Sequence, residues 1–152
     1  LRQFRGLEHR LEFVGTVRGV TIVNDSKSTT PDSLLYALAR ASTPVVPIIG
    51  GRDKGLDFRA LAAVLAEERV HGIVLIGESR RQLHALLNGR ANVRECETLD
   101  GALETALTLA RPGDTVLFSP ACASFDMFKN FEDRGRIFKE LVRQRQPAEG
   151  TP

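Results

Sequence analysis

The sequence predicts an α/β fold with a mostly parallel sheet and helices on both of its faces. From residue 20 onward, short apolar runs alternate with helical stretches, and this order is typical of strand–helix–strand units. The apolar runs are continuous, as expected for strands that are buried on both faces. A chain of 152 residues also fits one compact domain. We therefore expect a Rossmann-like domain.

The first predicted elements are two strands joined by a hairpin turn. Residues 11–17 and residues 20–25 both have strand composition. Arg18 and Gly19 lie between them and favour a tight turn. The first strand is therefore expected to add an antiparallel edge to the parallel sheet.

The later elements follow in regular alternation. Thr30 and Pro31 are expected as the N-cap and first residue of one helix, and Asp57 as the N-cap of the next. The predicted helices are residues 30–41, 57–68, 79–88, 98–110 and 128–143. The predicted strands are residues 44–51, 70–78, 92–97 and 114–120.

Composition excludes several classes of function. The net charge is +2, and no run of Lys or Arg indicates nucleic acid as a partner. No apolar run approaches the length of a membrane span. Cys96 and Cys122 lie far apart, which favours a reducing, cytoplasmic setting. His9, His71 and His84 lack the spacing of metal ligands, so no metal site is expected.

Three strand-to-helix loops carry unusual chemistry, and such loops meet at the edge of a parallel sheet where ligands bind. The first reads NDSKSTT at residues 24–30 and contains Asp25, Lys27 and four hydroxyl side chains. The helix behind it offers free N–H groups and the positive end of its dipole. These groups favour the binding of a carboxylate or a phosphate. The alternative is that the residues form an ordinary N-cap beside a solvated lysine.

The second loop reads GGRDKG at residues 50–55. Gly50 and Gly51 permit positive φ and a close approach of the backbone to a ligand. Lys54 could then reach inward as a point charge. A glycine-rich surface turn is the alternative explanation.

The third loop reads SPACAS at residues 119–124, and its small side chains let a ligand approach the backbone and the Ser124 hydroxyl. No spacing or partner histidine indicates that Cys122 is a nucleophile. The missing G-x-S-x-G pattern argues against Ser119 or Ser124 in a catalytic triad. The phenylalanines that follow are expected to pack beneath the loop as core: Phe125, Phe128 and Phe131.

Together the three loops predict one crevice for a dianionic small molecule. Lys27, Lys54 and Ser124 follow three different strands and should converge there. The crevice contains no recognisable general base. Neither a G-x-G-x-x-G nor a G-x-x-x-x-G-K-[ST] pattern occurs, so the domain is not expected to be the main holder of a dinucleotide or a triphosphate.

The order and spacing of four motifs resemble the C-terminal domain of the Mur ligases. The motifs are HR at residues 9–10, NDSKSTT, GGRDKG, and SPACASFDMFKNFEDRG at residues 119–135. The last is the most specific and is similar to the D-glutamate-adding members of the family. The resemblance covers residues 7–143. Full-length members have a UDP-binding N-terminal domain, a central ATPase domain with a P-loop, and this third domain.

The resemblance implies a boundary for each part of the chain. The chain lacks a P-loop, and its only methionine is Met127 rather than an initiator; both features are expected of a third domain separated from its partners. Residues 1–9 are expected to be a linker remnant from the central domain. Residues 10–145 would form the D-glutamate-binding domain, and residues 146–152 a flexible tail.

The resemblance also implies a reaction. ATP converts a carboxylate of UDP-N-acetylmuramoyl-L-alanine into an acyl phosphate, and the amine of D-glutamate attacks it to form an amide. Lys27 would act as the catalytic cation that neutralises charge near the transferred phosphoryl group or the amino-acid carboxylates. The D-glutamate carboxylates would be held by Thr29, Lys54, Ser124 and the backbone of Phe131.

The remaining implied roles concern ATP and the final loop. Arg10 and Asp25 would contact the ribose and base region of ATP, and Asn130 would support the loop. ATP and Mg²⁺ would be held mainly by the central domain, and the protein would be monomeric. The isolated domain would bind D-glutamate and close over ATP but would be inactive alone.

One motif departs from the family pattern. The family more often reads D-S-K-A-T-N, whereas Ser28 and Thr30 take the alanine and asparagine places here. Two other functions remain open: a stand-alone binding or regulatory module, and a sister ligase for a diamino acid or dipeptide. The long final motif argues against the first. The absence of a G-K-G-H-E motif after residues 114–119 argues against the second.

Overall fold

The computed structural model describes residues 7–52, 55, 57–87, 92–124 and 127–147. Within these residues the chain forms a six-stranded sheet in the order β1-β2-β6-β3-β4-β5. β1 pairs antiparallel with β2, and the other neighbours pair in parallel. The strands are β1 (Glu12–Val17), β2 (Val20–Asn24), β3 (Val45–Gly50), β4 (Ile73–Ile76), β5 (Val93–Glu95) and β6 (Thr115–Phe118).

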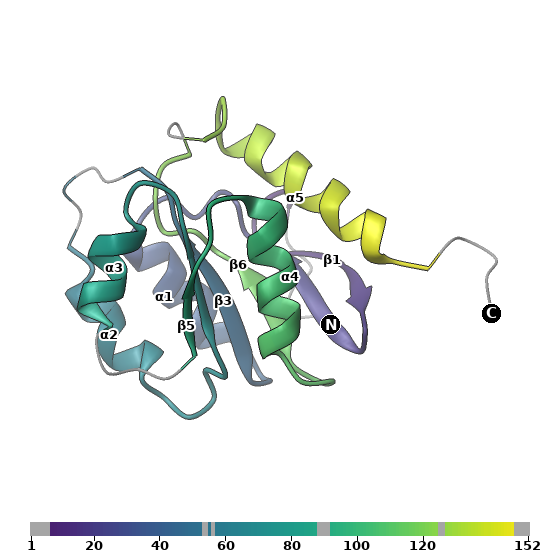
Figure 1. The fold of residues 1–152 in the computed structure, drawn as a ribbon, viewed down its shortest axis with the longest axis horizontal. Helices are drawn as coiled ribbons and strands as arrows, with labels where there is room; N and C mark the ends of the chain where they lie inside the picture. The colour runs from purple at the N-terminus through teal and green to yellow at the C-terminus, as the bar shows by residue number, and fades with distance from the viewer. Residues whose placement is uncertain (1–6, 53–54, 56, 88–91, 125–126, 148–152) are drawn as a thin grey trace.

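Helices cover both faces of this sheet (Figure 1). α1 (Pro31–Arg40), α2 (Arg59–Leu65) and α3 (Arg80–Leu86) pack on one face, and α4 (Leu99–Leu109) and α5 (Phe131–Arg145) on the other. Successive strand residues point to opposite faces, so neighbours such as Val45 and Val46 belong to different cores. The predicted Rossmann-like fold, with its antiparallel edge strand, is confirmed.

Two details of the helix predictions are wrong. The last helix begins at Phe131 rather than 128, because the Asn130 side chain accepts a hydrogen bond from the Asp133 N–H at 2.7 Å and caps the helix there. Phe58, not Asp57, is the N-cap of α2. The Asp57 carboxylate instead accepts hydrogen bonds from the backbone and the side chain of Arg59.

The strand-to-helix loops diverge at one edge of the sheet. The chain leaves β2 and β3 toward α1 and α2 on one face, but it leaves the intervening β6 toward α5 on the opposite face. Ligands of α/β proteins bind where adjacent loops diverge in this way. The loops that follow β2, β3 and β6 are the three that the sequence marks as chemically unusual.

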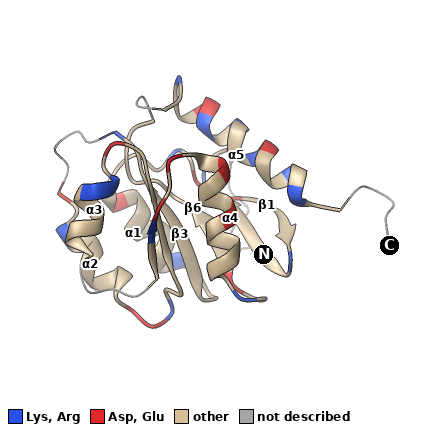
Figure 2. Ribbon diagram, in the orientation of Figure 1, with Lys and Arg blue, Asp and Glu red and all other residues tan. Residues whose placement is uncertain are grey.

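Charged residues of both signs are spread over the ribbon, with acidic and basic positions interleaved along α5 (Figure 2). In the part of the chain that the structure describes, no helix combines the length and the apolar character needed to cross a membrane.

Candidate functional site

A cleft of about 490 Å³ lies at the carboxyl end of β2. Arg10, Asp25, Lys27 and Thr29 all line it. These four residues come from two segments, the one before β1 and the one after β2. Of the three residues predicted to converge in one crevice, only Lys27 lines this cleft; Ser124 is not part of its lining, and Lys54 lies outside the described residues.

Asp25 forms the buried floor of this cleft. Its Oδ1 accepts the Leu11 N–H at 3.0 Å, and its Oδ2 accepts the Ser119 hydroxyl at 2.8 Å. Burial raises the pKa of Asp25 to about 6, even though these two hydrogen bonds and the charge of Arg10 favour the ionised form. Asp25 thus ties together the segment before β1, the end of β2 and the loop after β6.

Lys27 is exposed at the mouth of the cleft, and its position is fixed from two sides. Its backbone N–H donates to the His9 carbonyl at 2.9 Å. Its ammonium lies 4.9 Å from the centroid of the Phe131 ring, a cation–π contact between the first loop and the start of α5. The ammonium is thereby held over the site while staying accessible to an anion.

The N-terminus of α1 forms the other side of the cleft. Thr30 is the N-cap and Pro31 the first helical residue, as predicted. Thr30 and Ser33 form a capping box, because each side chain accepts the backbone N–H of the other residue. Ser28 Oγ lies 3.0 Å from Ser33 Oγ. The two residues that depart from the family pattern therefore build this helix cap.

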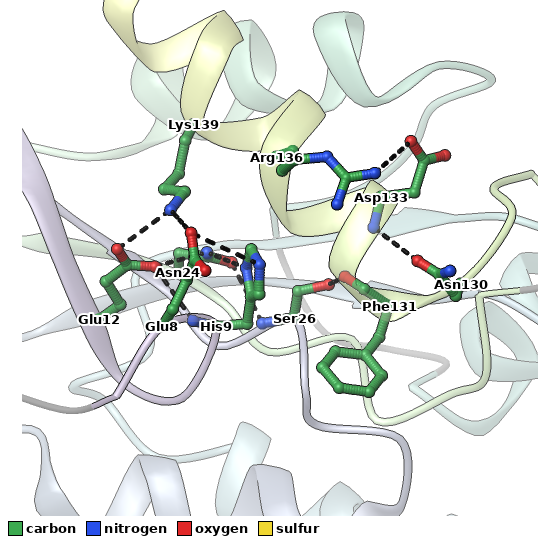
Figure 3. Close-up of polar contacts among 10 residues, drawn as sticks. All are labelled: Glu8, His9, Glu12, Asn24, Ser26, Asn130, Phe131, Asp133, Arg136 and Lys139. Carbon is green, nitrogen blue, oxygen red and sulfur yellow. Dashed lines mark hydrogen bonds and ion pairs between the residues drawn. The ribbon is translucent and has the colours of Figure 1, made fainter.

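The buried Arg134 joins the first loop to the third. Its side chain is 1% exposed and points from α5 into the space between the loops. It donates to the carbonyls of Ser26 and Cys122 at 2.6 and 3.0 Å, and to the Ser26 hydroxyl at 3.0 Å. That hydroxyl in turn donates to the Phe131 carbonyl at 2.7 Å (Figure 3). One guanidinium thus fixes the first and third loops against α5.

Sequence reasoning gave Arg134 no role, although one signal marks it. Arg134, Phe138 and Val142 are buried at helical spacing along α5. An arginine on the apolar stripe of a helix must satisfy its donors inside the protein, because buried charges are stable only when they are paired or hydrogen-bonded. The spacing therefore could have identified Arg134 as a buried loop anchor.

The second loop packs against the third through its glycines. Gly50 has φ 125° and Gly51 φ 152°. A Cβ at Gly50 would collide with the Ile76 carbonyl oxygen, and one at Gly51 with the Ala123 carbonyl oxygen. The Gly50 N–H donates to the Pro120 carbonyl at 2.8 Å. This close approach requires glycine, whereas Lys54 lies outside the described residues.

The other predicted residues of the third loop lie away from the cleft lining. Ser124 is buried, and its carbonyl accepts the Phe128 N–H at 2.9 Å. Phe128 packs against the core on the α5 face of the sheet, and Phe131 is half-buried beneath Lys27. Phe125 lies outside the described residues. Cys122 is buried beside Ser79, with 3.5 Å between its Sγ and the serine Oγ.

The histidines have structural partners. His9 is buried, and its Nδ1 lies 3.0 Å from Asn24 Nδ2. Since an amide nitrogen can only donate, His9 accepts here, and burial lowers its pKa. His71 pairs with Asp114 and His84 with Glu95. Across the described ranges, no three His, Cys, Asp or Glu side chains are grouped so that they could hold a metal ion.

Comparisons with known proteins agree with this geometry. A model of the Mur ligase glutamate ligase domain matches residues 9–122. The chain is 51% identical over 144 residues to the UDP-N-acetylmuramoylalanine–D-glutamate ligase of Chlorobaculum tepidum, covering 95% of the chain and 31% of the relative. It is 48% identical over 143 residues to the ligase of the same name from Cytophaga hutchinsonii, covering 93% of the chain and 32% of that relative.

A solved structure shows the same fold at low identity. The UDP-N-acetylmuramate–alanine ligase of Thermotoga maritima superimposes with a TM-score of 0.62 at 19% identity, covering 96% of this chain and 32% of that protein. The chain therefore spans about a third of the length of each of these three proteins.

Proposed function

This chain belongs to the Mur ligase family as its glutamate ligase domain, and we propose that it binds D-glutamate for a ligase that joins this amino acid to UDP-N-acetylmuramoyl-L-alanine. The family consists of ATP-dependent ligases that form amide bonds. The choice of D-glutamate rests on the names of relatives that are 48–51% identical. The observation that carries the proposal is the cleft itself, where Arg10, Lys27 and Thr29 meet beside the buried Asp25.

Arg10 and Lys27 balance the two aspartates of the cleft, Asp25 and Asp32, and Lys27 is the cation that is exposed at its mouth. Lys27 offers an accessible ammonium, and Thr29 offers a hydroxyl beside the N-terminus of α1. In this proposal Thr29, Lys54, Ser124 and the backbone of Phe131 hold the two carboxylates of D-glutamate. The Arg134 contacts support this assignment, because they tie the loop of Ser124 to the loop that carries Lys27 and Thr29.

ATP bound to a partner domain would contact the same edge of this domain. Arg10 and Asp25 would contact its ribose and base region, and Lys27 would stabilise the charge that develops during phosphoryl transfer. Among the described residues, no three ligating side chains are grouped so that they could hold a metal ion. We therefore assign the metal to the central ATPase domain, and we propose that the full protein is a monomeric cytoplasmic enzyme.

The catalytic contribution of this domain would be positioning. The reaction requires the D-glutamate amine to approach an acyl phosphate carried by a substrate on other domains. Holding two reactants in the correct orientation can remove several kcal/mol from a barrier, roughly 7 or more in favourable cases. Asn130, as the cap of α5, supports this by fixing the start of the helix from which Phe131 and Arg134 arise.

Titration of the nitrogen-15-labelled chain with D-glutamate and L-glutamate tests the substrate. We expect saturable chemical-shift changes at Thr29, Lys54 and Ser124 with the D isomer and much smaller ones with the L isomer. Lys27→Met should weaken the response, whereas Arg143→Met on α5 should preserve it. Equal responses to both isomers, or changes confined to other residues, would rule out a D-glutamate site here.

A second experiment tests the dependence on other domains. The isolated chain, mixed with ATP, D-glutamate and UDP-N-acetylmuramoyl-L-alanine, should release no phosphate. The full-length ligase should release phosphate only when all three are present. Clear turnover by the isolated chain would refute the division of labour between domains.

A further inference from the structure

The segment that carries Arg10 into the cleft has an unfavourable backbone conformation. Its two neighbours, His9 and Leu11, have φ values of 65° and 46°. Left-handed backbone is costly for residues with side chains and persists only when surrounding contacts enforce it. The position of Arg10 therefore depends on whatever holds the residues on either side of it.

Residues in and next to the sheet, together with α5, hold His9 and Leu11 in place. The His9 N–H donates to Glu12 Oε1 at 3.0 Å, and the same oxygen accepts Asn24 Nδ2 at 3.0 Å. The Leu11 N–H donates to Asp25. The His9 ring lies directly against Gly135 of α5, where a Cβ would overlap it. Glu12 is thus the acceptor that anchors His9 to β2.

Lys139 of α5 completes the arrangement. Its ammonium lies 2.6 Å from Glu8 Oε2 and 3.2 Å from Glu12 Oε2, and its side chain is only 15% exposed (Figure 3). Glu8 and Glu12 flank the strained segment, and one cation joins them. Without it, two carboxylates would face each other, and Glu12 would lose the partner that orients its other oxygen toward His9.

We propose that Lys139 is a positioning residue for the ATP end of the site, because its bridge between Glu8 and Glu12 fixes residues 8–11 and thereby the approach of Arg10 to the nucleotide. The inference rests on the proposed function, in which Arg10 contacts ATP. It implies that residues 8–11 move with this domain. Any hinge toward the central domain then lies before Glu8.

Lys139→Met in the full-length ligase tests the inference, because methionine keeps most of the side-chain length and removes the charge. Hydrogen–deuterium exchange of peptides that cover residues 8–11 should become faster. The KM for ATP should rise about fivefold, the size expected for loss of a partly buried ion pair. The KM for D-glutamate should change little, and Lys139→Arg should restore the KM for ATP.

Two further variants control for general damage. Glu8→Gln removes the charge of the exposed carboxylate that pairs with Lys139, and it should also raise the KM for ATP. Arg143→Met removes a cation from the same helix that pairs only with Glu140 among the described contacts, and it should change neither exchange nor KM.

Each result is decisive. Unchanged exchange at residues 8–11 in Lys139→Met would overturn the inference. Faster exchange with an unchanged KM for ATP would leave Lys139 a purely structural role and would also overturn it. If the wild-type ligase shows no activity that depends on D-glutamate, the proposed function itself has failed, and the inference falls with it.

Discussion

Replacing Arg134 by methionine tests how the first and third loops are held together. Methionine has a similar length but no hydrogen-bond donors. The Ser26 and Cys122 carbonyls therefore lose the hydrogen bonds that the guanidinium donates to them. The Ser26 hydroxyl loses a donor but keeps its bond to the Phe131 carbonyl. The change therefore leaves the two carbonyls with short contacts to Arg134 without that donor, removes a longer contact of 3.5 Å to the Ser28 carbonyl, and alters no backbone atom of α5.

The expected loss of stability follows from these contacts. A buried polar group without a partner costs about 1–3 kcal/mol. Removing a buried guanidinium also removes the cost of its desolvation, which offsets part of that loss. For the two carbonyls together, we expect the free energy of unfolding to fall by about 2–4 kcal/mol. The free energy of unfolding of Arg134→Lys should lie between those of the wild type and Arg134→Met, because one ammonium cannot reproduce the fork of guanidinium donors.

Urea unfolding of the 152-residue chain, followed by far-ultraviolet circular dichroism, measures this loss. Arg136→Met is the matched control, since Arg136 lies two residues away on the same helix but is exposed and pairs only with Asp133 in the described contacts. A loss below about 0.5 kcal/mol for Arg134→Met, typical of a surface substitution, would refute the role of Arg134 as a loop anchor.

Three further predictions follow from single residues. Burial raises the pKa of Asp25 to about 6, whereas the pKa of an aspartate in an unfolded chain is roughly 3.9. The folded state therefore binds the proton of the Asp25 carboxyl more tightly than the unfolded state does. The contribution of Asp25 to stability should therefore fall as pH rises from about 4 to 7; a carbon-13 titration midpoint near 4 would contradict this. Gly50→Ala should lower the melting temperature far more than Gly113→Ala, because both have positive φ but only Gly50 faces a backbone oxygen. Comparable losses would show that the close approach to Ile76 is unimportant. Lys54→Ala in the full-length ligase should raise the KM for D-glutamate, and an unchanged KM would remove Lys54 from the site.

The order of the elements could be predicted because the sequence signals are local. Apolar runs, the Thr30 cap with Pro31, and glycines after strands depend only on near neighbours in the chain. The start of α5 was misjudged because Phe128 looks like part of a helical stripe, whereas it packs against the core before Asn130 caps the helix. Hydrophobic spacing alone does not distinguish these two situations.

The cleft was predictable to the extent that its residues follow strand ends. Asp25, Lys27 and Thr29 come from one loop, and parallel topology fixes the edge where that loop lies. The partners of Arg134 and Lys139 could not be assigned in the same way, because Ser26, which Arg134 contacts, and Glu8, which Lys139 contacts, lie more than 100 residues earlier in the chain. Arginine and lysine are exposed by default, and only the packing of α5 on the first loop makes them anchors.

Backbone strain gathers at the same edge of the sheet. Three of the five described non-glycine residues with positive φ, His9, Leu11 and Ala121, lie there, whereas Arg18 and Asn92 lie elsewhere. Gly50 and Gly51 of the second loop also have positive φ. The segments of these residues are joined by Asp25, which accepts from Leu11 and Ser119, and by the bond between Gly50 and Pro120. Strained backbone survives where many contacts enforce it, and such places are often functional. The contacts on His9, Leu11 and Ala121 therefore hold strained backbone next to the cleft that we propose as the ligand site.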